Sequence, residues 1–197
     1  MASDQKDFSG TMPVQDKHRF DEAALADYLA SQIDDFQTPL TVEQFKGGQS
    51  NPTYRLVTPN RHYVLRRKPP GDLLPSAHAV DREYRVITAL ADTDVPVARS
   101  YCLCEDTSVI GTAFYVMDCI DGRVMWDPTL PGHDPADRAS IFDAMNATIA
   151  ALHTVDVNAV GLSDYGKPGN YFERQIARWS KQYRASETET IAAMDKL

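Results

Sequence analysis

The sequence predicts an α+β fold in which a sheet-rich first half is followed by a helical second half. Strand-like runs bounded by turn residues fill residues 41–67 and 100–120. Two helical patterns, at residues 21–36 and 78–91, precede and interrupt these runs. From residue 135 onward only helical spacing of apolar residues appears. These three observations indicate one sheet with helical cover, followed by a separate group of helices.

Composition and charge exclude several classes of function. The chain is 43% hydrophobic and 24% charged, as in ordinary globular proteins, and its net charge is −8 without a basic cluster. A nucleic-acid partner is not expected, because phosphate backbones are bound by clustered cations. No apolar run approaches the roughly 20 residues that span a bilayer, and the polar start lacks a signal sequence. We therefore expect no membrane contact and a cytoplasmic location.

The first half begins with a helix and three strands. An amphipathic helix is predicted at residues 21–36, where Asp21 can cap the start and apolar residues recur every three or four positions. Strands are predicted at residues 41–46, 53–58 and 62–67. Because short loops join these strands, they are expected to form an antiparallel meander.

A second helix and two more strands complete the predicted sheet region. A segment with three prolines precedes residues 78–91, whose apolar residues lie on one helical face. Strands are then predicted at residues 100–104 and 112–120. The result is a five-stranded antiparallel sheet covered by helices.

The second half is predicted to be helical. After a connection rich in turn residues, helices are expected at residues 135–153 and 170–184, and the start of another after residue 187. The predicted organisation is a flexible tail at 1–19, a sheet-rich region at 20–118, a linker at 119–134 and a partial helical region at 135–197.

The loop between the first two strands is the first candidate site. The stretch "KGGQSN" is longer than a tight hairpin requires, and its glycines allow backbone N–H groups to approach an anion closely. On its own the loop favours a plain wide hairpin, because a glycine pair is a weak motif. A phosphate-binding loop is the alternative.

Two charged residues favour that alternative. Strand alternation places Arg66 on the same side as Val64, and Glu83 lies at the border of the apolar face of the helix at 78–91. A partly buried carboxylate needs a cationic partner, although a border glutamate can also reach water. A glycine loop, a strand cation and a helix carboxylate are the parts with which protein kinases hold nucleotide phosphates.

The cysteines predict structural burial and no metal site. Cys102 and Cys104 lie on one face of a strand, and Cys119 is isolated. No His or Cys pair with the spacing of zinc ligands lies nearby.

Five stretches resemble the aminoglycoside phosphotransferase family, especially its branch associated with acyl-CoA dehydrogenases. They are "GGQSNPTYRL", "YVLRRKPPG", "AHAVDREYRVITAL", "VPVARSYCLCEDTSVIGTAFYVMDCIDGRV" and "YFERQIARWSKQY". The resemblance implies a two-lobed protein-kinase-like fold, binding of ATP and Mg²⁺, and transfer of a phosphoryl group to a small-molecule hydroxyl. The association with dehydrogenases makes a hydroxylated acyl-CoA-type molecule a candidate substrate.

The resemblance also implies roles for particular residues. Arg66 matches the kinase strand lysine and would bind the nucleotide phosphates while pairing with Glu83; an arginine fork departs from the usual lysine point charge. Val64 would cover the adenine. The loop that would cover the triphosphate comprises Gly47, Gly48, Gln49, Ser50 and Asn51, and the linker that would border the adenine comprises Met117, Asp118, Cys119 and Ile120.

The catalytic half of the family's site has no match in these 197 residues. The family carries a His-Gly-Asp loop and an aspartate for Mg²⁺, whereas "GHDP" at 132–135 opens a helix and His153 is expected to be structural. No catalytic residue or metal ligand is assigned, and the Mg²⁺ ligands are expected in a missing segment. The chain alone is therefore expected to be inactive, because a positioned base contributes about 10² to 10⁴ in rate.

Two further hypotheses compete with a phosphotransferase. A pseudo-kinase module would hold a nucleotide, or nothing, and dock a partner. An acyl-CoA dehydrogenase would need a flavin site in a largely helical domain, which the sheet-rich first half does not offer. Apolar residues such as Phe172, Ile176 and Trp179 are expected to be exposed and to favour association, or to be covered by another segment.

Overall fold

The protein is built on a six-stranded antiparallel sheet with the strand order β1-β2-β3-β4-β6-β5. The computed structural model describes residues 9–47, 51–71, 78–125, 127–167 and 169–196. The strands are β1 (Thr11–Met12), β2 (Thr41–Phe45), β3 (Thr53–Val57), β4 (His62–Arg67), β5 (Ser100–Cys104) and β6 (Phe114–Asp118). The α-helices are α2 (Glu22–Gln32), α3 (Val80–Ala89), α4 (Thr107–Ile110), α5 (Pro135–His153) and α6 (Tyr171–Ser186), with short 3₁₀ turns at Asp16–His18 and Met194–Lys196.

The five predicted strands are all present, and the sheet has one more strand than predicted. Residues 11 and 12, within the segment expected to be a flexible tail, form β1 and pair with β2. Side chains secure the same segment, because Gln44 accepts a hydrogen bond from the Gln15 amide and the Tyr54 hydroxyl donates to the carbonyl of His18. This strand was missed because two residues are too few to show a period-two pattern.

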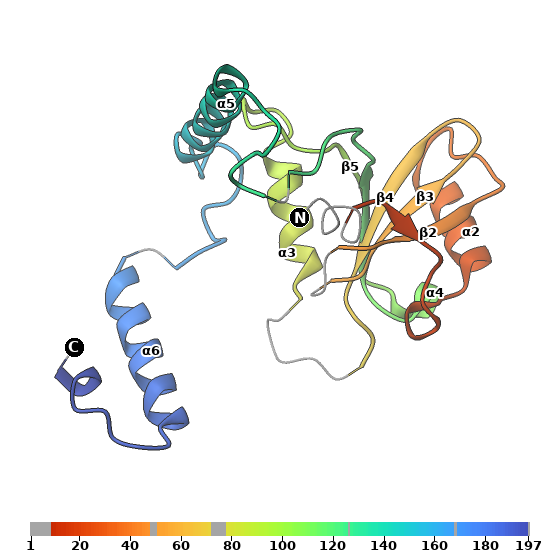
Figure 1. Ribbon diagram of the computed structural model, residues 1–197. Helices are drawn as coiled ribbons and strands as arrows, with labels where there is room; N and C mark the ends of the chain where they lie inside the picture. Colours follow the sequence, from red (N-terminus) through yellow and green to blue (C-terminus); the bar gives the residue numbers. More distant parts are fainter. Residues whose placement is uncertain (1–8, 48–50, 72–77, 126, 168, 197) are drawn as a thin grey trace. The chain divides into compact units, whose positions relative to one another are not determined.

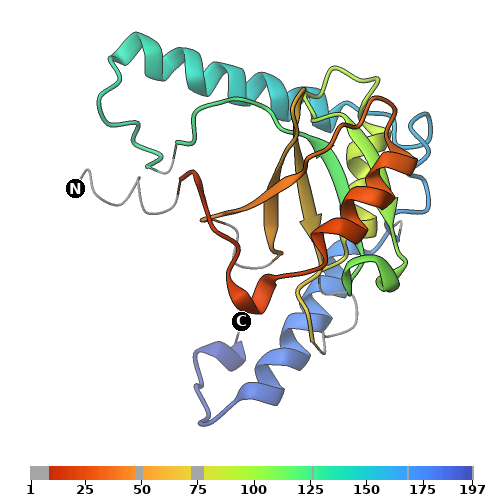
Figure 2. The ribbon, with the colours of Figure 1, turned by 90° about the vertical axis from the view of Figure 1, so that its right-hand side faces the viewer.

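The core lies on one face of the sheet, under α2. Alternate residues of β3, β4 and β6 point to this face, among them Tyr54, Leu65 and Phe114, which are fully buried. Figure 1 and Figure 2 show α2 against the sheet, and its Leu25 and Leu29 are fully buried in the same cluster. The opposite face therefore receives the other residues of each strand, and α3 contacts β5 and β6 there.

Several helix ends differ from the prediction. The first helix was expected to reach residue 36 but ends at Gln32, because Ile33 has an extended backbone and Asp35 is left-handed. The short helix α4 was not predicted; Asp106 caps it by accepting a hydrogen bond from the amide of Ser108. In place of the helix expected after residue 187, only a 3₁₀ turn forms.

The chain divides into two compact units, and the division lies after Asp156, beyond the boundary predicted near residue 118. The second unit contains α6, whose Phe172, Ile176 and Trp179 are exposed. In the part of the chain that the structure describes, no helix is long and apolar enough to cross a membrane.

Candidate functional site

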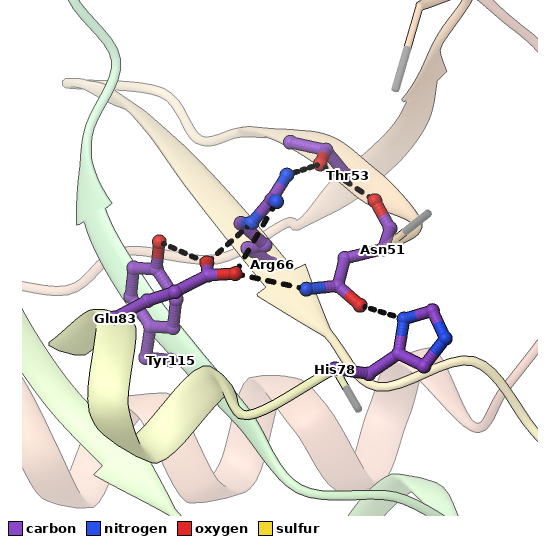
Figure 3. Close-up of polar contacts among 6 residues, drawn as sticks. All are labelled: Asn51, Thr53, Arg66, His78, Glu83 and Tyr115. Carbon is purple, nitrogen blue, oxygen red and sulfur yellow. Dashed lines mark hydrogen bonds and ion pairs between the residues drawn. The ribbon is translucent and has the colours of Figure 1, made fainter. Parts of the chain in front are cut away.

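An ion pair between β4 and α3 lies at the centre of the site. The Arg66 Nε donates to Glu83 Oε2 at 2.6 Å, and its Nη2 lies 3.4 Å from Glu83 Oε1. Both side chains keep about a third of their surface exposed, 28% and 33% respectively. Figure 3 shows the guanidinium and the carboxylate facing each other among four polar neighbours. The pairing predicted from sequence is confirmed.

The Glu83 carboxylate accepts hydrogen bonds from several side chains. Besides Arg66, the Asn51 Nδ2 donates to Oε1 at 3.0 Å and the Tyr115 hydroxyl donates to Oε2 at 3.1 Å. Burial, together with the neighbouring carboxylate, raises the pKa of Tyr115, so its hydroxyl stays a donor. A carboxylate offers about four acceptor positions, and four N–H or O–H groups are directed at this one. Glu83 is therefore a partner for Arg66 and has no capacity left for a metal ion.

The Arg66 guanidinium retains donors for a ligand. It has five N–H groups, of which described residues take three: two are directed at Glu83 and one, on Nη1, at the Thr53 hydroxyl 3.2 Å away. One N–H on each terminal nitrogen is left. Two parallel N–H groups on a planar fork match the geometry of a phosphate or carboxylate.

Strand register brings these groups together. Thr53 of β3 pairs with Arg66 of β4, which in turn pairs with Tyr115 of β6, so the three side chains lie in one row on one face of the sheet. The first turn of α3 supplies Glu83 over this row, and near its start Asp81 lies 3.9 Å from the Lys68 ammonium. Sequence position alone does not reveal that α3 crosses the sheet at this row.

The glycine loop is only partly described. Gly47 follows β2, and Gly48, Gln49 and Ser50 lie outside the described residues. Asn51, which the sequence placed over the triphosphate, is instead 97% buried, since its exposed fraction is 3%. Its side-chain amide is used inside the protein, by Glu83 at one end and by His78 at the other. The Asn51 side chain is therefore engaged within the protein, and the place of Asn51 over the triphosphate stays a prediction.

The predicted adenine-binding residues divide between the two faces. Val64 and Met117 pair across β4 and β6, on the same face as Arg66. Asp118 lies on the other face, where its carboxylate accepts a 2.5 Å hydrogen bond from Tyr101, and its amide donates to the carbonyl of Arg99. The Asp118 N–H is therefore used within the protein, and the place of Asp118 beside the adenine stays a prediction.

The last two linker residues leave the sheet. Cys119 is half-buried, and burial raises the pKa of its thiol, so a reactive thiolate is not favoured at neutral pH. Ile120 is exposed.

Three residues of the site were not found by sequence reasoning. Thr53 and Tyr115 could have been found, because each is the register partner of Arg66 in a neighbouring strand. His78 gives no such signal, because its ring meets Asn51 only through the path of the chain into α3.

No metal cluster marks this row among the described side chains. Within the described ranges, no group of three or more His, Cys, Asp and Glu side chains is arranged to hold a metal ion. A cavity of about 580 Å³ opens instead at the end of α2, and Asp34, Arg61 and Tyr101 are among its lining residues. Arg66 and Glu83 do not line it.

Comparison with known proteins agrees with the kinase-like arrangement. A model of the phosphotransferase enzyme family matches residues 41–197. A crystal structure from Ralstonia eutropha, of a protein provisionally named an aminoglycoside phosphotransferase, superposes with a TM-score of 0.79 at 60% sequence identity. The alignment covers 90% of this chain and 51% of that one. The likeness extends beyond the sheet-rich region, since it includes most of the chain.

Curated relatives are much longer proteins with a different name. The chain is 46% identical over 188 residues to acyl-CoA dehydrogenase family member 10 of Mus musculus, and 41% identical over 200 residues to family member 11 of Homo sapiens. It is 49% identical over 184 residues to a protein of Arabidopsis thaliana named "Probable acyl-CoA dehydrogenase IBR3". The chain spans 18% to 25% of the length of these relatives.

Proposed function

The chain belongs to the phosphotransferase enzyme family, and on this premise we propose that it carries the ATP-binding part of a phosphotransferase that acts on a small-molecule hydroxyl. The observation that supports this most directly is the Arg66–Glu83 ion pair, with two guanidinium N–H groups left over. A strand cation held by a helix carboxylate is the arrangement with which kinases bind nucleotide phosphates.

Arginine changes how the phosphates are held. A lysine would contribute a point charge, whereas the Arg66 fork contributes two directed N–H groups while the rest of its donors remain on Glu83 and Thr53. The ion pair thus fixes the plane of the guanidinium before a ligand arrives. Such preorganisation lowers the entropic cost of binding.

Other contacts with the nucleotide follow from the same face of the sheet. Val64 and Met117 offer apolar surface for the adenine beside Arg66. The backbone N–H groups of the loop from Gly47 to Asn51 are proposed to cover the phosphates. When bound, Mg²⁺ supplies charge neutralisation between phosphate oxygens. The described residues do not form a site for that ion.

The acceptor is proposed to be a hydroxyl on a small molecule. Because relatives are named acyl-CoA dehydrogenases, a hydroxylated acyl thioester is the substrate class that we propose. Phosphorylation of this hydroxyl would create a phosphate leaving group on an acyl-CoA-type molecule, the class of compound in the names of these relatives.

A nucleotide-binding module without catalysis is the second candidate function. It is favoured by one observation: the 197 residues contain no His-Gly-Asp motif to supply a catalytic base. This hypothesis predicts binding of nucleotide without transfer, even when the chain is supplied as part of a longer protein.

We also propose a cytoplasmic location. The three cysteines are free thiols, and Cys102 and Cys104 are buried without forming a disulfide. Free thiols are usual in a reducing compartment, which is also where ATP is abundant.

Thermal unfolding with Mg-ATP tests the proposed function. At 100 times its Kd, a ligand that binds only the folded state stabilises it by about 2.7 kcal/mol, which is a shift of about 5–11 °C in Tm. We expect this shift for the wild type and its loss in Arg66→Ala.

Arg61→Ala is the matched control. It removes an arginine whose side chain donates to the Tyr101 hydroxyl, away from Glu83. If Arg66→Ala is stabilised by Mg-ATP as strongly as Arg61→Ala, the role assigned to Arg66 is wrong.

A further inference from the structure

The polar groups around Arg66 form a closed ring of hydrogen bonds. The Arg66 Nη1 donates to the Thr53 hydroxyl, and this hydroxyl donates to the backbone carbonyl of Asn51 at 3.1 Å. The Asn51 side chain then donates to Glu83, which accepts from Arg66 and so closes the ring (Figure 3). The orientation of the guanidinium is therefore tied to the position of Asn51.

The ring fixes the direction of every proton in it. An ionised carboxylate can only accept, so the Asn51 atom facing Glu83 must be its NH₂ group. Its carbonyl oxygen then faces the His78 ring, where Nδ1 lies 2.7 Å away. Because that oxygen can only accept as well, the His78 Nδ1 must carry a proton. This holds for both the neutral Nδ1–H tautomer and the imidazolium.

His78 connects the ring to the start of α3. Its carbonyl accepts a hydrogen bond from the amide of Val80, and the N-cap residue Ala79 has no side chain that could cap the helix. The backbone of His78 is left-handed, with φ of 58°, a conformation that His, Asn and Asp adopt more readily than most residues. The ring of His78 is thereby directed from the beginning of α3 onto the residue that ends the glycine loop.

We propose that His78 is a positioning residue for the nucleotide phosphates, because it holds Asn51 in the orientation that completes the Arg66–Glu83 ring. The nucleotide part of this inference rests on the proposed function. Among the described residues the His78 ring bonds to Asn51, and it acts by holding the last residue of the glycine loop to the start of α3.

A matched pair of substitutions tests the hydrogen bond at nearly constant side-chain size and backbone tolerance. His78→Asn keeps a donor at the place of Nδ1 and tolerates the left-handed backbone. His78→Asp has nearly the same size and the same backbone tolerance, but it presents an oxygen to the Asn51 oxygen. We expect His78→Asp to weaken Mg-ATP binding about tenfold, which corresponds to about one lost hydrogen bond in a charged network. His78→Asn should restore affinity to within about threefold of the wild type.

Nuclear magnetic resonance gives a readout that needs no nucleotide. The ¹H–¹⁵N signal of the Arg66 Nε–H, identified by its loss in Arg66→Lys, reports the ion pair directly. We expect this signal to move in His78→Asp and to stay near its wild-type position in His78→Asn. His153→Asp, an equal change of charge at an exposed position of α5, serves as the control and should leave the signal in place.

The outcomes distinguish this inference from the proposed function. If wild type shows no Mg-ATP binding while the Nε–H signal follows the pattern above, the proposed function fails and the positioning role stands. If His78→Asp leaves both the signal and the affinity unchanged, the inference is overturned. If His78→Asp does not fold, the ¹⁵N spectrum of wild-type His78 decides, because a neutral ring protonated at Nε2 contradicts the inference and one protonated at Nδ1 supports it.

Discussion

At the residue scale, Tyr115 of β6 stabilises the Arg66–Glu83 ion pair through a hydrogen bond from its buried hydroxyl. The side chain is 2% exposed, and its hydroxyl donates to Glu83 Oε2 at 3.1 Å. The ring packs against Tyr84 of α3, with 6.0 Å between ring centroids. Tyr115 therefore joins β6 to α3 both by packing and by a hydrogen bond to a charged group.

Tyr115→Phe is expected to lower the free energy of unfolding by about 1–2 kcal/mol, because a hydrogen bond to a carboxylate is lost while the ring remains. Urea unfolding measures this change. Tyr84→Phe is the matched control, because the Tyr84 ring packs against Tyr115. Among the described tyrosines, only Tyr115 donates its hydroxyl to Glu83. An equal loss in both variants would contradict the role given to the Tyr115 hydroxyl.

Residue identity predicted the ion pair but not its surroundings. Arg66 and Glu83 could be paired from sequence because strand alternation and helical periodicity each place one charge on a half-buried face. The inward direction of the Asn51 amide was not predicted, because a loop residue has no such periodicity. Its burial depends on the approach of His78, a tertiary contact across 27 residues.

At the element scale, a polar cluster fastens the first three strands together. Glu43 of β2 accepts hydrogen bonds from the Thr11 hydroxyl of β1 at 2.7 Å and from Arg55 Nε of β3 at 2.9 Å. These hydrogen bonds, the one from Thr11 first, lower the pKa of Glu43 below its ordinary value. The two-residue strand β1 thus owes part of its attachment to a charge.

The stabilisation by Glu43 should depend on pH. Its carboxyl has a lower pKa in the folded state, so its contribution is present above the ordinary glutamate value of 4.5 and is lost as the pH falls through the lowered value. We expect the Tm difference between wild type and Glu43→Gln to be largest above about pH 5 and to shrink toward pH 3.

The exposed Glu105 gives the control for that experiment. Glu105→Gln removes a carboxylate just after β5, outside the cluster. A Tm difference for Glu43→Gln that grows on acidification, or that matches Glu105→Gln at every pH, would show that the cluster does not stabilise β1.

Helix α6 presents an apolar stripe to solvent. Phe172, Ile176 and Trp179 are spaced four and three residues apart, which places them on one face, and each is more than 60% exposed. Contiguous exposed apolar surface of this kind favours association.

We expect the chain to associate in a concentration-dependent way, and Phe172→Glu to reduce that association. Sedimentation velocity over a tenfold concentration range measures the change. Lys181→Gln, on the same helix, makes the charge more negative by the same one unit and is the control. Association that is the same in both variants would mean that this stripe is not the contact.

At the scale of the whole molecule, the candidate site lies entirely within the first unit. β3, β4, β6 and α3 supply four of the six residues of the polar ring and its attachments, and Asn51 and His78 lie in the adjoining loops. The buried cluster that supports these elements also ends well before residue 157. Nucleotide binding is therefore expected to be a property of this unit.

Phosphoryl transfer requires more groups than nucleotide binding does. A catalytic base and Mg²⁺ ligands are needed in addition to a phosphate-binding cation, and the described residues offer no metal cluster. We expect the purified 197-residue chain to bind Mg-ATP without forming a phosphorylated product from hydroxylated acyl thioesters. Mass spectrometry of the reaction mixture tests this, and ATP-dependent product formation by the chain alone would contradict it.

The sequence by itself determined the order of the five predicted strands and of the helices α2, α3, α5 and α6, and the two charges that pair. These follow from local periods of two and 3.6 residues, which are set by backbone geometry and survive any arrangement of the chain. Only the tertiary structure decided that residues 11 and 12 extend the sheet, that the Asn51 amide turns inward, and that His78 holds it there. Such contacts join segments with no shared periodicity, so they exist only once the sheet has brought those segments within hydrogen-bonding distance.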